Sequence, residues 1–143
     1  NIKYRDIQGL EQNIDNLRPF NVFESLITKG WYRYSLEKLR SMHKISDHEK
    51  AVIQVFRIGN TFFGSAPCEY FSQHALRIKE ESSADNTFVV SLANGWLGYI
   101  PHKEAFKRRG GHESTWAIWS KMETDAGDII ADNIINLIKE LEK

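Results

Sequence analysis

The hydrophobic pattern of this chain changes its period about one third of the way along, and this change most restricts the fold. Residues 23–42 carry apolar side chains at helical spacing, with Tyr32, Leu36 and Leu39 on one stripe. Residues 51–58 (AVIQVFRI) are instead rich in β-branched and aromatic side chains, as is typical of a buried strand. A chain with both periods is expected to form a mixed α/β structure, with helices packed on a sheet.

Two turn signals predict two β-hairpins in the second part of the chain. Gly59-Asn60 and Asn94-Gly95 each lie between two runs of strand-forming residues, and Asn-Gly is a strong signal for a two-residue hairpin turn. The predicted hairpins join residues 51–58 to 61–63, and residues 87–93 to 96–100. In the second hairpin, Tyr99 is expected to share one apolar face with Phe88, Val90, Leu92 and Leu97.

Helical spacing and helix-start signals predict the remaining elements. Gly64-Ser65-Ala66-Pro67 is interpreted as a strand break followed by a helix. The last helix is the clearest, because Thr124 or Asp125 can cap it and its apolar stripe is regular. The predicted helices cover residues 7–14, 23–42, 67–81, 102–106 and 126–141, and an edge strand is expected at residues 115–119.

Composition excludes several classes of protein. The 143 residues hold 19 Lys and Arg and 19 Asp and Glu, whereas a generic nucleic-acid binder carries a basic excess. No apolar run reaches the length of a transmembrane helix. The single cysteine, Cys68, excludes an internal disulfide and a thiolate zinc cluster. Because the first residue is Asn1 rather than Met, we expect one domain or a segment of a larger catalytic domain, with residues 1–50 as a helical lead-in.

Each candidate functional residue also has an ordinary structural explanation. Glu69, in the first turn of the predicted helix 67–81, would offset the helix dipole by about 0.3–1 kcal/mol. Tyr99 would be a core tyrosine with a hydrogen-bonded hydroxyl. Cys68 would gain thiolate character at that helix start, but no sequence neighbour supplies a base. His112 and Glu113 are adjacent, so on regular backbone their side chains diverge.

The order of motifs over residues 51–143 is more specific than any single motif. It reads IGNTFFGSAPCE, then a helix ending LRIK, then TFVVSLANGWLGYIP, then EAF, GGHE and a closing amphipathic helix. This order resembles the C-terminal part of the catalytic domain of the neutral/alkaline ceramidase family, and bacterial relatives of unproven substrate look closer still. Members of that family are zinc-dependent amidohydrolases that cleave ceramide into sphingosine and a fatty acid.

The resemblance implies a role for three residues. The family's Pro-Gly-Glu corresponds to Pro67-Cys68-Glu69, which makes Glu69 a zinc ligand. The family's second zinc-binding motif ends in a tyrosine, which is Tyr99 here. His112 stands where the family has a tyrosine that holds the substrate or the developing oxyanion. Two histidine ligands and a serine nucleophile lie upstream in the family, so the N-terminal remainder of the same protein would supply them.

The implied function is therefore hydrolysis of a lipid-like N-acyl amide at a zinc site completed by upstream residues. Family members work mostly outside the cytoplasm, secreted or periplasmic. Two departures from the family pattern, Cys68 and His112, support an alternative, which is a non-catalytic module that binds a lipid or a glycoconjugate on the same scaffold. A third possibility is a structural domain in which Glu69 only caps a helix and Tyr99 only fills a core.

Overall fold

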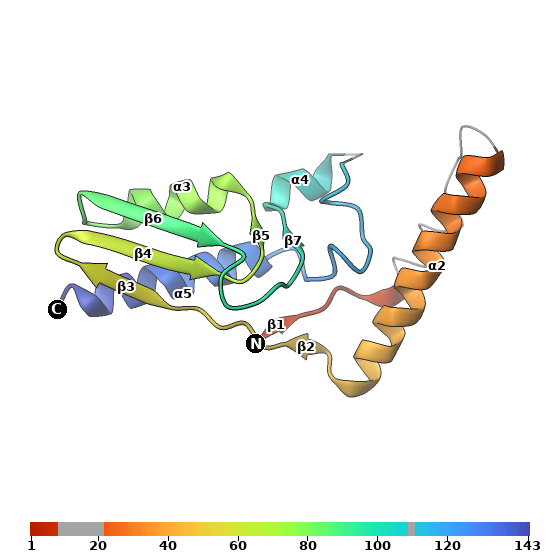
Figure 1. Ribbon diagram of the computed structural model, residues 1–143, viewed down its shortest axis with the longest axis horizontal. Coiled ribbons are helices and arrows are strands. Elements are labelled where there is room, and N and C mark those ends of the chain that lie inside the picture. Colours follow the sequence, from red (N-terminus) through yellow and green to blue (C-terminus); the bar gives the residue numbers. More distant parts are fainter. Residues whose placement is uncertain (9–21, 109–110) are drawn as a thin grey trace.

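The computed structural model of this chain describes residues 1–8, 22–108 and 111–143 (Figure 1). It has the predicted mixed α/β architecture, while most of the predicted helix 7–14 lies outside the described residues. The helices are α2 (Val22–Ile45), α3 (Ser72–Glu81), α4 (Lys103–Lys107) and α5 (Ala126–Leu141). The strands are β1 (Ile2–Lys3), β2 (His48–Glu49), β3 (Val55–Ile58), β4 (Thr61–Ala66), β5 (Glu69–Tyr70), β6 (Asn86–Ser91) and β7 (Tyr99–Ile100).

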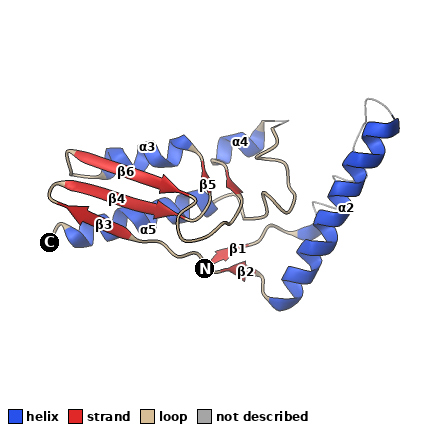
Figure 2. Ribbon diagram, viewed as in Figure 1, coloured by secondary structure: helices blue, strands red, loops and turns tan. Residues whose placement is uncertain are grey.

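A three-stranded sheet with the order β3-β4-β6 lies at the end of the molecule opposite α2 (Figure 2). β3 and β4 form the hairpin predicted at Gly59-Asn60, with Phe56 opposite Phe63. β6 pairs with the other side of β4 in parallel, and Phe63 is in register with Phe88. A parallel pair needs a crossover connection, and the segment containing β5 and α3 provides it. The sheet is therefore mixed.

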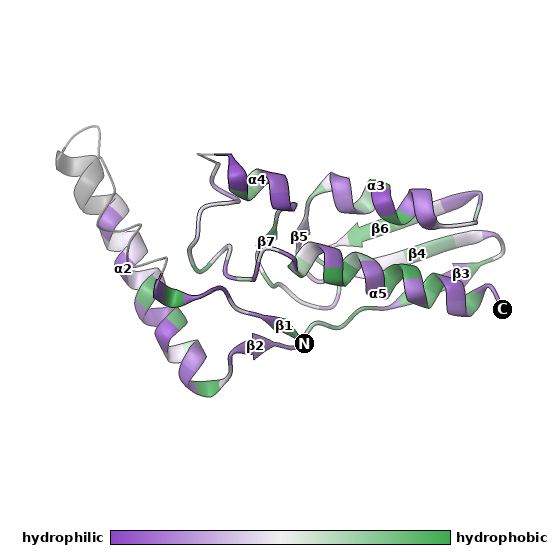
Figure 3. Ribbon diagram, turned by 180° about the vertical axis from the view of Figure 1, so that it is seen from behind, coloured by the Kyte–Doolittle hydropathy of each residue, from purple (hydrophilic) through white to green (hydrophobic). Residues whose placement is uncertain are grey.

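One face of this sheet is covered by α3 and α5, and the main core lies between this face and the two helices (Figure 1). Phe62 points from β4 into this core and is 1% exposed. Gly64 lets α5 approach closely, since a Cβ there would lie 2.6 Å from Cγ2 of Ile134. Viewed from the helix side, α3 is mostly hydrophilic, whereas hydrophobic turns alternate along α5 (Figure 3). The stripe predicted for the last helix is right for Ala126, Ile130 and Ile134, which are buried. Its last two members are not in the core, because Leu137 is only partly buried and Leu141 is exposed.

The opposite face of the sheet carries a row of three phenylalanines. Phe56, Phe63 and Phe88 are in register across β3, β4 and β6. The rings of Phe63 and Phe88 stack with centroids 5.3 Å apart, and Phe56 and Phe88 are about half exposed. Ile58 and Val90 on the same face are exposed as well, so this apolar face is open in the described structure.

The hairpin predicted after β6 is wrong. Leu92 and Asn94 have positive φ values of 57° and 66°, and the Leu92 N–H donates to the Cys68 carbonyl at 3.0 Å. The chain therefore turns across the end of β4 instead of returning along β6. The next strand, β7, pairs in parallel with β5. Tyr99 consequently does not share a face with Phe88, as the hairpin would require.

The helix predicted over residues 67–81 begins five residues late, at Ser72. Its first predicted turn instead makes strand-like hydrogen bonds, because the carbonyl of Pro67 accepts the Leu97 N–H at 2.8 Å. The break predicted at residues 64–67 is wrong too, since β4 continues to Ala66. Pairing with β6 satisfies the backbone of this segment better than a local helical turn would.

The edge strand predicted at residues 115–119, in the region before α5, is not formed. Ala117 and Ser120 form only an isolated bridge there. Trp116 is 7% exposed and packs with Leu39 of α2 in a second, smaller core cluster. The stripe predicted on the first long helix is thus the side that contacts this region. At the start of α5, Asp125 makes no side-chain capping hydrogen bond.

A buried histidine joins α3 to α5. His74 is 4% exposed, and its ring stacks on Tyr70 with centroids 4.8 Å apart. The Tyr70 hydroxyl donates to the Gly127 carbonyl at 2.5 Å, and Nε2 of His74 lies against Gly127 with no hydrogen-bond partner among the described residues. Burial lowers the pKa of His74, although the Pro101 backbone and Asp128 oppose this effect.

We expect this histidine to make the fold less stable in acid. Because the pKa of His74 is lower in the folded state, the unfolded chain binds the proton more tightly. The stabilising contribution of neutral His74 is complete above the ordinary pKa of about 6.5 and is lost as the pH falls through the folded value, with a slope of at most about 1.4 kcal/mol per pH unit. Urea titrations from pH 7.5 to 4.5 should therefore show a flatter pH dependence for His74→Gln than for wild type. His48→Gln, at an exposed position, is the control, and an unchanged slope in His74→Gln would contradict the prediction.

Candidate functional site

Two neighbouring short strands bring the two principal candidate residues together. β5 and β7 pair in parallel, and Glu69 is directly in register with Tyr99. The Glu69 N–H donates to the Gly98 carbonyl at 3.0 Å, and the Tyr99 N–H donates to the Trp119 carbonyl at 2.7 Å. Residues in register on adjacent strands project to the same side of the sheet. The backbone therefore presents a carboxylate and a phenol side by side.

The side chains of this pair interact directly. The hydrogen bond to Glu69, followed by burial and by the charges of Glu69 and Glu113, raises the pKa of Tyr99. The phenol beside this carboxylate therefore keeps its proton at physiological pH. Trp96 also donates to this carboxylate, with its Nε1 lying 3.2 Å from Oε1 of Glu69. Glu69 thus accepts a hydrogen bond from the Trp96 indole and lies beside the Tyr99 phenol.

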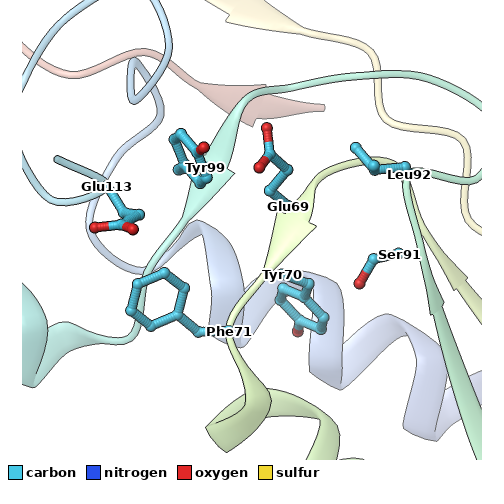
Figure 4. A pocket seen from close by; sticks show the side chains of 7 residues that line it. All are labelled: Glu69, Tyr70, Phe71, Ser91, Leu92, Tyr99 and Glu113. Carbon is cyan, nitrogen blue, oxygen red and sulfur yellow. The ribbon is translucent and has the colours of Figure 1, made fainter.

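An open pocket of about 350 Å³ contains this pair (Figure 4). In the close-up, Glu69 and Tyr99 lie next to each other, with Glu113 beyond Tyr99 and Leu92 on the other side of Glu69. The lining combines carboxylates, hydroxyls and apolar groups and contains no basic side chain. Its residues are Glu69, Tyr70, Phe71, Ser91, Leu92, Tyr99 and Glu113.

The third candidate, His112, lies at the edge of the phenol and does not line the pocket. Its ring stacks on Trp119 with centroids 4.9 Å apart, and it meets the Tyr99 ring edge-on at 5.6 Å. The Trp119 indole donates to the His112 carbonyl at 3.1 Å. The adjacent Glu113 faces the pocket instead. The two neighbouring side chains thus take different directions, as their spacing predicts.

The ordinary explanation offered for Glu69 is wrong. Glu69 lies in β5 and not in the first turn of a helix, so it does not offset the dipole of α3. The explanation offered for Tyr99 is also incomplete, because its hydroxyl lies at a pocket beside a carboxylate and not within an apolar core. Leu97, two residues earlier, does enter the core, at 2% exposure.

Cys68 is a core residue with no nucleophilic character. Its side chain is fully buried, and burial, with a smaller effect from Glu69, raises the pKa of the thiol to about 12. The thiolate fraction at neutral pH is therefore negligible. Cys68 is not among the residues with positive φ. A Cβ thus fits this backbone, and the departure from the family's glycine does not distort the strand that holds Glu69.

The remaining histidines do not line this pocket, although His74 stacks on Tyr70 and His102 packs against Phe71, two residues of its lining. His43 packs against Tyr4 with ring centroids 5.1 Å apart, His48 is paired with Asp47 at 2.7 Å, and His74 is buried under α5. Across residues 1–8, 22–108 and 111–143, no group of three His, Cys, Asp or Glu side chains is arranged to hold a metal ion. The pocket itself offers the Glu69 carboxylate and the Tyr99 phenol as neighbouring oxygen donors.

Trp96 and Lys121 lie next to Glu69 or next to each other, and no sequence pattern marks either of them as part of this site. Lys121 is 5% exposed, and its ammonium lies 5.6 Å from the centre of the Trp96 ring. Lys121 follows a short apolar run in which it continues no periodic pattern, so no sequence signal marks it. Trp96 was placed in the return strand of the predicted hairpin, where its indole would not reach Glu69.

Comparison with known proteins adds no family to this picture. The chain matches no protein-family model, and the comparisons with curated proteins and with solved structures returned no significant match either. Within the part of the chain that the structure describes, no helix combines the length and the hydropathy needed to cross a membrane. The pocket and the sequence motifs are therefore the observations that bear on function.

Proposed function

We propose that this chain supplies part of the active site of a ceramidase-like, zinc-dependent amidohydrolase that cleaves a lipid-like N-acyl amide. The observation that carries the proposal is the pairing of Glu69 with Tyr99, because the motif resemblance independently selects these two residues as zinc ligands. They are thirty residues apart in sequence, yet they are in register on adjacent strands, and the Glu69 carboxylate raises the pKa of the Tyr99 phenol.

The donor set fits part of a zinc site. Zinc accepts carboxylate oxygen, and a catalytic zinc keeps one position open for water or substrate beside its protein ligands, so four protein ligands would make the ion five-coordinate. Glu69 and Tyr99 would hold the ion, and the N-terminal remainder of the protein would add the two histidines. When bound, zinc polarises the amide carbonyl and activates a hydroxyl or water. The pocket that contains these two residues is open and has a volume of about 350 Å³, which leaves room for further ligands and substrate.

The chain's own residues have separate tasks in this proposal. Glu69 supplies the negative charge that holds the cation, and Tyr99 places its phenol oxygen beside that carboxylate. His112 meets the edge of the Tyr99 ring outside the pocket lining, so its ring would have to leave Trp119 to donate a hydrogen bond to a developing oxyanion. Leu92 and Phe71 give the pocket apolar walls, which suit the alkyl part of a lipid-like amide.

Zinc content of the full-length protein tests the role of Glu69. Purified wild type is expected to hold about one zinc per chain, and Glu69→Gln should lose it, because the amide that replaces the carboxylate is uncharged. Glu113→Gln is the matched control, since it removes a carboxylate from the same pocket without removing a proposed ligand. Metal analysis by mass spectrometry gives the ratio. Equal zinc in wild type and Glu69→Gln would overturn the assignment.

The alternative of a non-catalytic binding module is favoured by two observations. The described residues bring only two of the proposed zinc ligands together, and the pocket walls are partly apolar. This alternative predicts no zinc in wild type and retained binding of an acyl lipid or a glycoconjugate. Turnover of any N-acyl amide that is lost in Tyr99→Phe would exclude it.

A further inference from the structure

A chain of contacts leads from Glu69 away from the pocket into a buried ion pair. Trp96 lies at the first step, with its indole nitrogen 3.2 Å from Oε1 of Glu69. The Trp96 ring is 52% exposed, so packing alone does not fix its orientation. The ammonium of Lys121 also lies over this ring, 5.6 Å from its centroid. This separation is within the range of a cation–π interaction, and tryptophan is the strongest acceptor for one.

Lys121 is an unusual residue to find in this position. Its side chain is 6% exposed, and its ammonium lies 3.2 Å from Oε2 of Glu49. The Tyr4 hydroxyl donates to the same oxygen at 3.2 Å. A buried ammonium costs several kcal/mol of desolvation unless it is paired. Glu49 and the Trp96 ring are the partners that offset this cost, so the position of Lys121 is well determined.

The partners of Lys121 are themselves held by the first strand of the protein. β1 pairs with β2, with Ile2 opposite Glu49, and the Tyr4 N–H donates to the Asp47 carbonyl at 2.9 Å. Burial and the neighbouring Glu49 carboxylate raise the pKa of Tyr4 to about 12. The phenol therefore remains a donor to Glu49 at physiological pH. This end of the contact chain is anchored in backbone structure.

We propose that Trp96 is a positioning residue for Glu69, and that the buried Lys121, paired with the partly exposed Glu49, fixes Trp96 in the orientation that this role requires. The proposal rests on the function proposed above, in which Glu69 is a metal ligand. A carboxylate accepts several hydrogen bonds, so an indole donor on Oε1 sets the direction of the group and leaves acceptor capacity toward Tyr99 and a cation. Partners of this kind around a ligating side chain commonly change metal affinity by 10–100-fold.

The first test detects the hydrogen bond in the full-length protein without any metal. Trp96→Phe keeps an aromatic ring over Lys121 but removes the N–H donor, and it identifies the Trp96 indole signal in a ¹H–¹⁵N spectrum by its loss. In wild type this signal should exchange slowly with deuterium. In Glu69→Gln at the same pH it should move upfield and exchange faster, because the acceptor has lost its charge. An indole signal that is unchanged in Glu69→Gln would overturn the proposal.

The second test measures the consequence for zinc, with zinc alone as the probe. Trp96→Phe should weaken zinc binding by about tenfold in calorimetric titrations. Trp31→Phe, which removes an exposed indole on α2, should leave the affinity unchanged. Lys121→Met should weaken binding by about threefold, and Lys121→Arg should restore it because it keeps the cation. Equal affinity in wild type and Trp96→Phe would overturn the positioning role.

The two tests separate this proposal from the proposed function. If wild type binds no zinc but the Trp96 signal responds to Glu69→Gln, the positioning of Glu69 is upheld and the zinc assignment is wrong. If wild type binds zinc and the Trp96 signal does not respond, the zinc assignment stands and the positioning role is wrong. If Lys121→Met fails to fold, the zinc affinity of Trp96→Phe compared with that of wild type still tests the positioning role of Trp96.

Discussion

Gly98→Ala is expected to lower the free energy of unfolding by about 3–5 kcal/mol, combining overpacking and backbone strain. Gly98 has a φ of +89°, and a Cβ at this position would overlap the carbonyl oxygen of Trp119 and lie 2.9 Å from its carbonyl carbon. Neither atom can move away easily, since that oxygen accepts the Tyr99 N–H at 2.7 Å. The substitution therefore acts on the backbone that places Tyr99.

The measurement is urea unfolding followed by circular dichroism, with Gly59→Ala as the matched control. Gly59 also has a positive φ, +60°, but a Cβ there would meet nothing within 4 Å. The control should therefore lose only about 1–2 kcal/mol, from strain. We expect a decrease in Tm of about 10 °C or more for Gly98→Ala and a much smaller one for Gly59→Ala. Equal losses in the two variants would show that close approach of the Trp119 carbonyl contributes nothing.

Phe62→Ala is expected to cost about 3–5 kcal/mol, the usual range for removing a fully buried phenylalanine. Phe62 is 1% exposed in the core between the sheet and α5, so its removal leaves a cavity next to well-packed isoleucines. Phe88→Ala is the control on the same sheet. Phe88 is 49% exposed on the open face, and its loss should cost about 1 kcal/mol, mainly from its stacking on Phe63.

These two variants also test which face of the sheet is covered in solution. Chemical denaturation of both at two protein concentrations gives the comparison. If Phe88→Ala were as damaging as Phe62→Ala, the row of phenylalanines on the open face would have to be buried against something in solution. A small effect of Phe88→Ala at both concentrations agrees with the described arrangement.

The parts of the fold that depend on local signals were predictable. The hairpin at Gly59-Asn60 and the helix over residues 126–141 follow from turn chemistry and from a regular apolar stripe. The hairpin at Asn94-Gly95 failed although its local signal was as strong. There, parallel pairing with β4 satisfies the backbone of β6, and this pairing depends on residues about 25 positions away.

The candidate site was predictable only in part, for the same reason. Spacing along the chain gives no hint that Glu69 and Tyr99 are in register, since the strands that hold them are two residues long and far apart in sequence. The motif resemblance selected both residues, whereas the residues alone favoured ordinary explanations. Composition, hydrophobic periodicity and motifs do not predict the contact of Lys121 with Trp96, because it arises from tertiary packing alone.

The parallel pairing of β5 with β7 also has a consequence for the order in which the molecule forms. A contact between residues thirty positions apart costs more loop-closure entropy than a hairpin turn, and non-local pairings slow folding. The β3–β4 hairpin and α5 can form early from local contacts, whereas the pocket exists only after the chain has closed this longer loop. A partly folded chain would therefore have most of its secondary structure and no pocket. During synthesis, the pocket cannot assemble until Tyr99 has left the ribosome.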